Sequence, residues 1–85
     1  MSKLELVQAV KALAKDNLTT GPHWEVCHNL CQAHEGEPDY DWVHGLVHAI
    51  EGDVANAGYW YRRAGKTQVH DDTKLEWEHI AVQLG

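Results

Sequence analysis

The stretch HGLVHAIEGDVANAGYWYRRAG, residues 44–65, decides the fold, because it contains parts of two helices and the turn that joins them. Apolar residues recur at helical spacing on both sides of Gly52 and Asp53. Glycine ends helices because it adopts the left-handed backbone conformation easily, and aspartate begins them because its side chain accepts hydrogen bonds from free N–H groups. We therefore expect one helix to stop at Gly52 and a second, over residues 54–64, to be capped by Asp53.

Three further helices are expected outside this stretch. Apolar residues at helical spacing place them at about residues 3–16, 22–35 and 74–84. The helix that stops at Gly52 follows Pro38, with Asp39 expected as its N-cap. Capping boxes are expected at two helix starts, Ser2 with Glu5 and Thr73 with Glu76. The loops are short, so we predict one all-α domain over residues 1–85, a compact bundle of about five short antiparallel helices.

The composition limits the classes of function. The chain has 85 residues, 44% of them hydrophobic, with four Trp and no Phe, which is enough for one core. A formal net charge of −6 disfavours binding to nucleic acid, because phosphates repel an acidic protein. No apolar run approaches the ~18 residues of a membrane span. Cys27 and Cys31 share a helix face but do not point at each other, so we expect reduced thiols and a cytoplasmic location.

Two segments of the chain match each other at an offset of 16 residues. CHNLCQAHEGE at 27–37 and VHGLVHAIEGD at 43–53 share His, Leu, Ala, Glu and Gly, and both end in an acid. Each helix therefore presents a histidine and a glutamate two turns apart, His28 with Glu35 and His44 with Glu51. The match fits either an internal duplication or a composition rich in these residue types.

Residues 41–65 resemble the helical hairpin of a tetratricopeptide-type repeat. The family's turn and small or aromatic packing positions would be Gly45, Gly52, Asp53, Val54, Ala57, Tyr61 and Ala64. Arrays of such repeats need about three copies, and this chain is too short for them. The resemblance therefore implies a solenoid-like hairpin inside a compact bundle, on a scaffold that binds proteins in that family. The whole chain is also similar to small helical proteins with an EGD..NA.YWYRRAG segment, a similarity that implies no activity.

Four side chains of this histidine-rich protein form a candidate metal site. His44 and His48 lie one helical turn apart, so both imidazoles can reach one ion, and Glu51 can add a carboxylate. His28 of the preceding helix could complete the site between the helices. In the repeat family, large apolar residues are usual where this chain has His44 and His48. The alternative is a structural role, in which the imidazoles pack against tyrosines and pair with Glu51 or Asp41.

Two other groups of residues are candidates for function. Cys27 could act as a nucleophile with a neighbouring histidine as base, although a thiol on an apolar face usually acts as a small hydrophobe. Tyr59, Arg62 and Arg63 are expected on the outer face of their helix, and aromatic and arginine side chains are enriched where proteins bind one another. The Trp and Tyr between Tyr59 and Arg62 are expected to pack inward. Neither a serine-nucleophile motif nor a phosphate-binding loop is present.

The sequence leaves three classes of function open. A small cytoplasmic module that binds a protein partner or a second copy of itself comes first. A metal- or small-ligand-binding protein that uses His28, His44, His48 and Glu51 comes second. An enzyme comes third, because no complete catalytic set is visible. No cofactor is expected apart from a divalent metal ion at the histidines, and neither nucleic acid nor a membrane is an expected partner.

Overall fold

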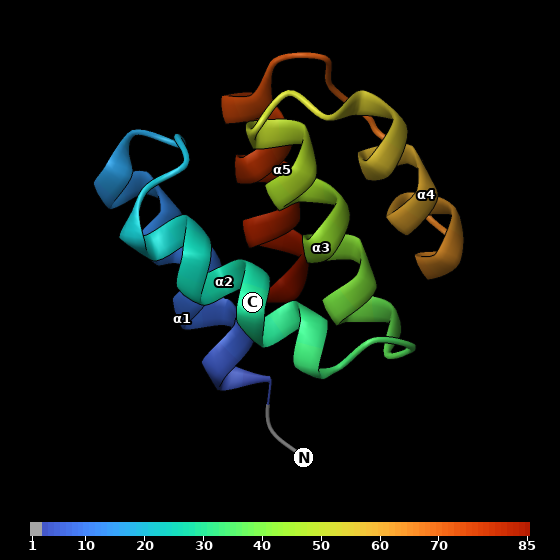
Figure 1. Ribbon diagram of the computed structural model, residues 1–85, viewed down its shortest axis with the longest axis horizontal. Helices are drawn as coiled ribbons and strands as arrows, with labels where there is room; N and C mark the ends of the chain where they lie inside the picture. The colour runs from blue at the N-terminus through green and yellow to red at the C-terminus, as the bar shows by residue number, and fades with distance from the viewer. Residues whose placement is uncertain (1–2) are drawn as a thin grey trace.

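The computed structural model describes residues 3–85, and helices are the only regular secondary structure among them. In chain order they are α1 (Leu4–Ala12), the 3-10 helix η1 (Leu13–Asp16), α2 (Pro22–Ala33), α3 (Pro38–Ile50), α4 (Val54–Ala64) and α5 (Thr73–Leu84). The prediction of a compact all-α bundle with five short helices is confirmed (Figure 1). None of the helices in residues 3–85 combines the length and the apolar character that crossing a membrane requires.

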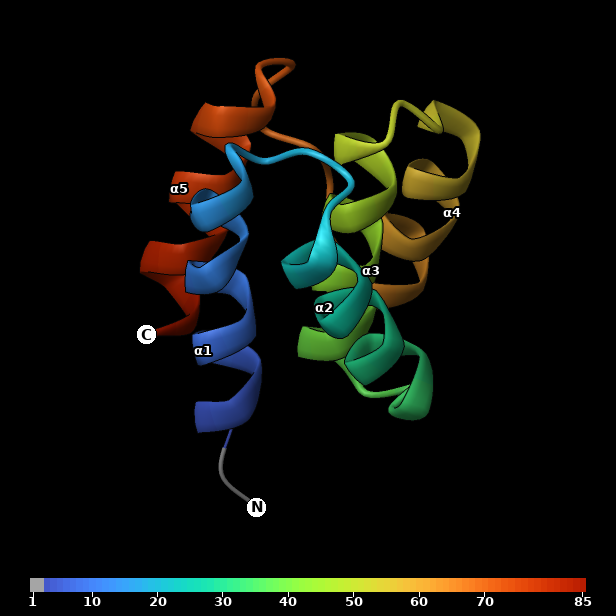
Figure 2. The ribbon, with the colours of Figure 1, turned by 60° about the vertical axis from the view of Figure 1, so that its left-hand side comes forward.

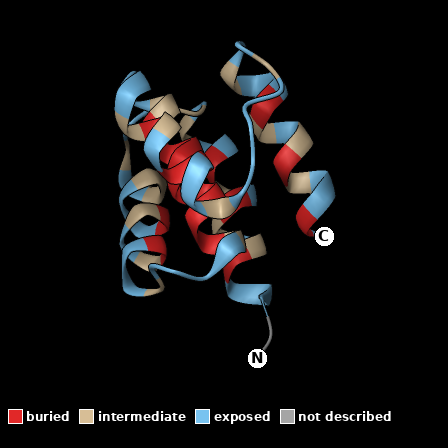
Figure 3. Ribbon diagram, turned by 90° about the vertical axis from the view of Figure 1, so that its right-hand side faces the viewer, coloured by how far each residue is buried: buried red, intermediate tan, exposed pale blue. Residues whose placement is uncertain are grey.

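Helix α3 lies at the centre of the molecule. It packs against α2, α4 and α5, while α1 packs against α2 and α5. Figure 2 shows α1 and α5 side by side, with α4 beyond α3. Residues 40–48 of α3 are all buried, as the red central ribbon of Figure 3 shows. Polar side chains in this run therefore need partners inside the protein.

The core joins residues from every helix. Its side chains with no exposed surface include Leu6, Val10, Leu13, Cys27, Cys31, Val43, Leu46, Val47 and Ile80. Two tryptophans at its margin satisfy their indole N–H groups on backbone carbonyls. Trp77 donates to the Val10 oxygen at 2.7 Å, which ties α5 to α1. Trp24 donates to the Val47 oxygen at 2.7 Å, which ties α2 to α3.

Gly45 allows α3 and α4 to approach closely. A Cβ atom at Gly45 would lie 3.0 Å from Cδ1 of Tyr61 and 3.1 Å from the backbone oxygen of Ala57. The turn between the helices follows the prediction: Gly52 has a φ of +88°, and the Asp53 carboxylate accepts a hydrogen bond from the Asn56 N–H at 3.2 Å. The helical hairpin is therefore present, and its wider resemblance to a repeat family stays a prediction.

Two helix starts and two helix ends differ from the predictions. The N-cap position of helix α3 is Glu37, whose side chain makes no capping hydrogen bond, and not Asp39, because Pro38 takes the first helical position, where no N–H is needed. Asp39 instead pairs with Lys3, Nζ to Oδ2 2.8 Å. The last turn of the first predicted helix is the 3-10 helix η1, and α2 ends at Ala33, two residues early.

The predicted capping box at Thr73 and Glu76 is wrong. Asp72 caps α5 by accepting hydrogen bonds from the N–H groups of Lys74 and Leu75. Glu76 turns inward and accepts hydrogen bonds from two N–H groups of the preceding loop, those of Val69 and His70. The other predicted box includes Ser2, which lies outside the described residues.

Candidate histidine site

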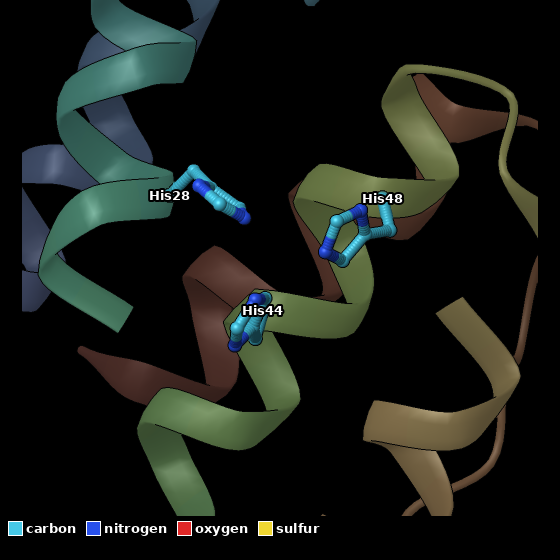
Figure 4. A group of neighbouring side chains, drawn as sticks. All are labelled: His28, His44 and His48. Atoms are coloured by element: carbon cyan, nitrogen blue, oxygen red, sulfur yellow. The ribbon is translucent and has the colours of Figure 1, made fainter. Parts of the chain in front are cut away.

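Three histidines converge between α2 and α3. One ring nitrogen from each of His28, His44 and His48 lies within 4.8 Å of the others. The ring centroids are 5.0 Å apart for His28 and His44, 5.1 Å for His28 and His48, and 5.0 Å for His44 and His48. Figure 4 shows the rings turned toward one space, His28 from α2 and the other two from α3. The structure thus brings together the three histidines that the sequence singled out.

The helical register explains this convergence. His44 and His48 are four residues apart, so both side chains leave the same side of α3. His28 follows Cys27, which points into the core, and the ~100° step between consecutive helical residues turns His28 to the edge of the interface with α3. His28 is accordingly half-buried, whereas His44 and His48 are buried.

His28 is held by a tryptophan of its own helix. Trp24 lies four residues earlier and stacks on the His28 ring, with centroids 5.0 Å apart and an interplanar angle of 4°. The Trp24 indole is fixed in turn by its hydrogen bond to the Val47 oxygen. The stacking contact thus orients His28, and the hydrogen bond of Trp24 fixes that orientation relative to α3.

Different partners hold the other two rings. Trp60 of α4 stacks on His44, with centroids 3.8 Å apart and an interplanar angle of 12°. Nδ1 of His48 lies 2.5 Å from Oε2 of Glu51. An ionised carboxylate can only accept a hydrogen bond, so Nδ1 carries a proton, and in the neutral imidazole Nε2 of His48 is the nitrogen with the lone pair. Each of the three imidazoles therefore has its own positioning partner.

His44 is the most deeply placed member of the cluster. Its side chain is 2% exposed, and its Nδ1 atom is buried without a hydrogen-bond partner within residues 3–85. Buried polar atoms in proteins almost always have a partner. Burial, followed by the charges of His48, His28 and Arg63, lowers the pKa of His44 to about 4. The ring is therefore neutral at pH 7 and can donate a lone pair.

The spacing of the nitrogens fits a transition-metal ion. Zinc binds imidazole nitrogen at about 2.0–2.1 Å, which places the nitrogens of a tetrahedral site about 3.4 Å apart. The nitrogens here lie within 4.8 Å of one another, so ring movements of about 1 Å would close the site. The three residues therefore fit such an ion with small side-chain adjustments.

The predicted carboxylates lie outside the three-histidine cluster. Glu51 groups with His48 and Asp53 on the outer side and reaches the cluster through the His48 ring. Asp41 is 1% exposed and accepts hydrogen bonds from the Gly36 N–H, to Oδ1 at 3.1 Å and to Oδ2 at 3.2 Å. Glu51 thus positions His48, and Asp41 holds the loop between α2 and α3.

Two tryptophans position histidine rings of the cluster, and neither contact was predicted: the hairpin resemblance implied that His44 lies near Trp60 but not that the rings stack, and Trp24 had no expected role. The spacing of four residues between Trp24 and His28 could have indicated their contact, because such residues are neighbours on a helix surface. Trp60 was expected to pack inward, and it is 7% exposed. Its partner His44 lies on another helix, so no local spacing could have shown their stacking.

The cysteines offer no accessible thiol. Cys27 and Cys31 are both free and have no exposed surface. The hydrogen bond to Cys27 and burial raise the pKa of Cys31. Two of the histidines considered as the base pair with carboxylates instead. His23 in α2 pairs with Asp16, with 3.0 Å between Nδ1 and Oδ2, and His34 just after α2 pairs with Glu37, with 2.7 Å between Nδ1 and Oε2. This arrangement gives the nucleophile hypothesis no geometric support.

The candidate interaction residues lie on the outer side of α4, as expected. Tyr59 is 46% exposed, and Arg62 and Arg63 are also exposed. Arg63 donates a hydrogen bond from Nη1 to the Tyr59 hydroxyl at 3.3 Å. Its guanidinium carbon lies 4.9 Å from the Trp60 ring centroid. This surface therefore adjoins the ring that covers His44.

Comparisons with protein-family models, with curated proteins and with solved structures found no match to this chain. Function is therefore inferred from the geometry of the site itself.

Proposed function

We propose that the protein binds a divalent transition-metal ion of the zinc class through His28, His44 and His48. The observation that supports this function best is that a different residue holds each of the three converging rings. Trp24 holds His28, Trp60 holds His44 and Glu51 holds His48. Hydrogen bonding of a ligand histidine to a carboxylate is a recurrent feature of metal sites, because it fixes the ring and raises its basicity. The buried Nδ1 atom of His44, which lacks a hydrogen-bond partner in the described part of the chain, adds to this support.

The donor set selects the class of ion. Imidazole nitrogen suits zinc, copper, nickel and cobalt, whereas magnesium and calcium prefer oxygen ligands. All three members of the cluster offer nitrogen, and no cysteine belongs to it within residues 3–85. Three protein ligands leave a fourth position of a tetrahedral ion for water or another small ligand. A borderline ion such as zinc is therefore the expected occupant.

Zinc binding measured by calorimetry, with protein purified without a histidine tag, tests this function. We expect one ion per chain and a dissociation constant below about 10 µM. His28→Ala, which changes a half-buried side chain, and His44→Leu should each weaken binding at least about 100-fold, because a two-ligand site remains. His34→Ala is the matched control, since His34 pairs with Glu37 at the end of α2, and should leave the affinity unchanged.

The result that would remove the proposal is a wild-type dissociation constant weaker than about 100 µM, or one that His28→Ala does not change. Circular dichroism of each variant establishes that it is folded. His28→Ala is the decisive variant, because His44 is buried and its replacement can also affect folding.

A second candidate function is protein binding through Tyr59, Arg62 and Arg63. Three of the seven basic residues of this acidic chain lie within residues 62–66, which favours an acidic partner, including a second copy of the chain. Light scattering at low ionic strength tests self-association. It should disappear in Arg62→Glu with Tyr59→Ala, and a wild-type chain that stays monomeric at about 1 mM would exclude self-association of useful strength.

A further inference from the structure

Trp60 connects a buried imidazole with an exposed cation. Its ring stacks on His44 with centroids 3.8 Å apart, and the guanidinium carbon of Arg63 lies 4.9 Å from the same ring. His44 is 2% exposed and Trp60 is 7% exposed, whereas Arg63 is exposed. We call this series of contacts, from the histidine cluster to the surface, the His44–Trp60–Arg63 column.

The outer end of this column is held in place. Arg63 donates a hydrogen bond to the Tyr59 hydroxyl at 3.3 Å, and its guanidinium also lies 5.8 Å from the Tyr59 ring centroid. The charges of Asp41 and Glu35 act on the same guanidinium. Within residues 3–85 the bond to Tyr59 is the guanidinium's one hydrogen bond, so its other donors can bind an anion, since a guanidinium has five.

We propose that Arg63 lowers the metal affinity of the histidine cluster across Trp60, so that an anion bound to Arg63 raises that affinity. This inference rests on the proposed metal binding. Arg63 is a positioning residue in this account, because it acts on the cluster through Trp60 and through its charge.

The physical basis is repulsion between two cations that both lie beside the buried Trp60 ring. The two contacts with Trp60 keep the guanidinium carbon within about 9 Å of the His44 ring centroid, and the buried indole that touches both groups displaces water that would screen the charges. A metal ion in the cluster adds positive charge at the inner end of the column. An anion that neutralises Arg63 therefore favours binding of the metal ion to the cluster. Binding of the metal ion favours binding of the anion to Arg63 to the same degree.

Carboxylate is the class of anion that fits the outer end best. An arginine fork binds a carboxylate with two parallel hydrogen bonds, and the Tyr59 ring beside it adds an apolar contact. An acidic side chain of a partner protein would then report metal occupancy at the surface. Arg63→Glu places a carboxylate at this point without any partner.

A charge series at position 63 tests the proposal, with zinc affinity measured at low and at high salt. Arg63→Met removes the charge and keeps an unbranched stem over Trp60, and Arg63→Lys keeps the charge. We expect Arg63→Lys to bind zinc as the wild type does, Arg63→Met roughly three- to tenfold more tightly, and Arg63→Glu more tightly still. These differences should shrink at about 1 M salt, which a purely structural role would not produce.

Arg62→Met is the matched control, because it makes the same change of net charge one residue away. A Cβ at Gly58 would lie 3.2 Å from Nη1 of Arg62, which places this guanidinium against Gly58. Arg62→Met should change zinc affinity by less than about twofold.

Equal affinities across the position-63 series, weaker binding by Arg63→Met, or an equal effect of Arg62→Met would overturn the role of Arg63 while leaving metal binding intact. Absence of zinc binding in the wild type and in every variant would overturn the metal site and this inference together.

Discussion

Trp60 lies nearly flat against His44, with ring centroids 3.8 Å apart and 12° between the ring planes. The two residues come from neighbouring helices, α4 and α3. This contact covers one face of the most buried histidine, whose ring lies beside those of His28 and His48 (Figure 4). It therefore links the packing of the helical hairpin to the geometry of the site.

Replacing Trp60 should affect both stability and metal binding. Trp60→Ala removes a large, 7% exposed ring and leaves a cavity, so the free energy of unfolding should fall by about 3–5 kcal/mol in urea denaturation. Zinc affinity should also fall, because His44 loses its stacking partner. Tyr59→Ala, next to it but 46% exposed, should cost less than about 1 kcal/mol. Similar losses for the two variants would argue against the packing role of Trp60.

Glu51 should strengthen metal binding only indirectly, by holding the ring of His48. Its carboxylate accepts the Nδ1 hydrogen bond and directs Nε2 toward the cluster. Glu51→Ala should weaken zinc binding about 10- to 100-fold, as losses of such outer partners do in metal sites. Glu25→Ala, which changes an exposed glutamate of α2, is the control and should have no effect. Unchanged affinity in Glu51→Ala would show that His48 needs no carboxylate partner.

Two glycines of the hairpin should respond oppositely to alanine. Gly45→Ala places a Cβ 3.0 Å from the buried Tyr61 ring and 3.1 Å from a backbone oxygen, so thermal or urea unfolding should show a loss of about 1–3 kcal/mol. At Gly58 the nearest atom is the mobile end of Arg62, 3.2 Å away, which can move aside. Gly58→Ala should therefore be neutral or stabilise by up to about 1 kcal/mol, because alanine favours helix more than glycine does. Equal effects would contradict the close approach of α3 and α4.

The metal-free protein should lose stability between pH 6.5 and 4. Burial, with the charges of His48, His28 and Arg63, lowers the pKa of His44 from 6.5 to about 4. In this window the unfolded chain binds a proton that the folded chain does not, so the free energy of unfolding falls as the pH drops and levels off below about 4. The loss from His44 amounts to at most about 3 kcal/mol.

Urea denaturation at pH 7, 5.5 and 4.5 measures this loss, with His44→Leu as the variant that lacks the titrating ring. The fall should be smaller in the variant, and a fall of equal size would exclude His44 as its source. Asp16 does not interfere, because hydrogen bonds from the backbone and ring of His23 lower its pKa below 3.8 and its contribution is lost only at lower pH.

Local patterns predicted the helices and the hairpin turn well, because Gly52, Asp53 and the apolar spacing act within a few residues. The capping box at Thr73 and Glu76 failed, because the carboxylate of Glu76 is used by the loop before the helix instead. Sequence spacing also selected His44 and His48 as a pair. The contact of these two rings with His28 depends on how α2 packs on α3. The stacking of His44 on Trp60 depends on how α4 packs on α3. Local spacing along the chain does not determine either packing.

X-ray absorption spectroscopy of the zinc-loaded protein tests the metal site most directly. We expect a shell of nitrogen or oxygen atoms at about 2.0 Å, with the outer-shell scattering of three imidazoles and no sulfur. His28→Ala should reduce the imidazole contribution from three rings to two. A first shell made mainly of oxygen atoms, a sulfur shell near 2.3 Å, or an imidazole count that His28→Ala does not change would contradict the proposed metal site.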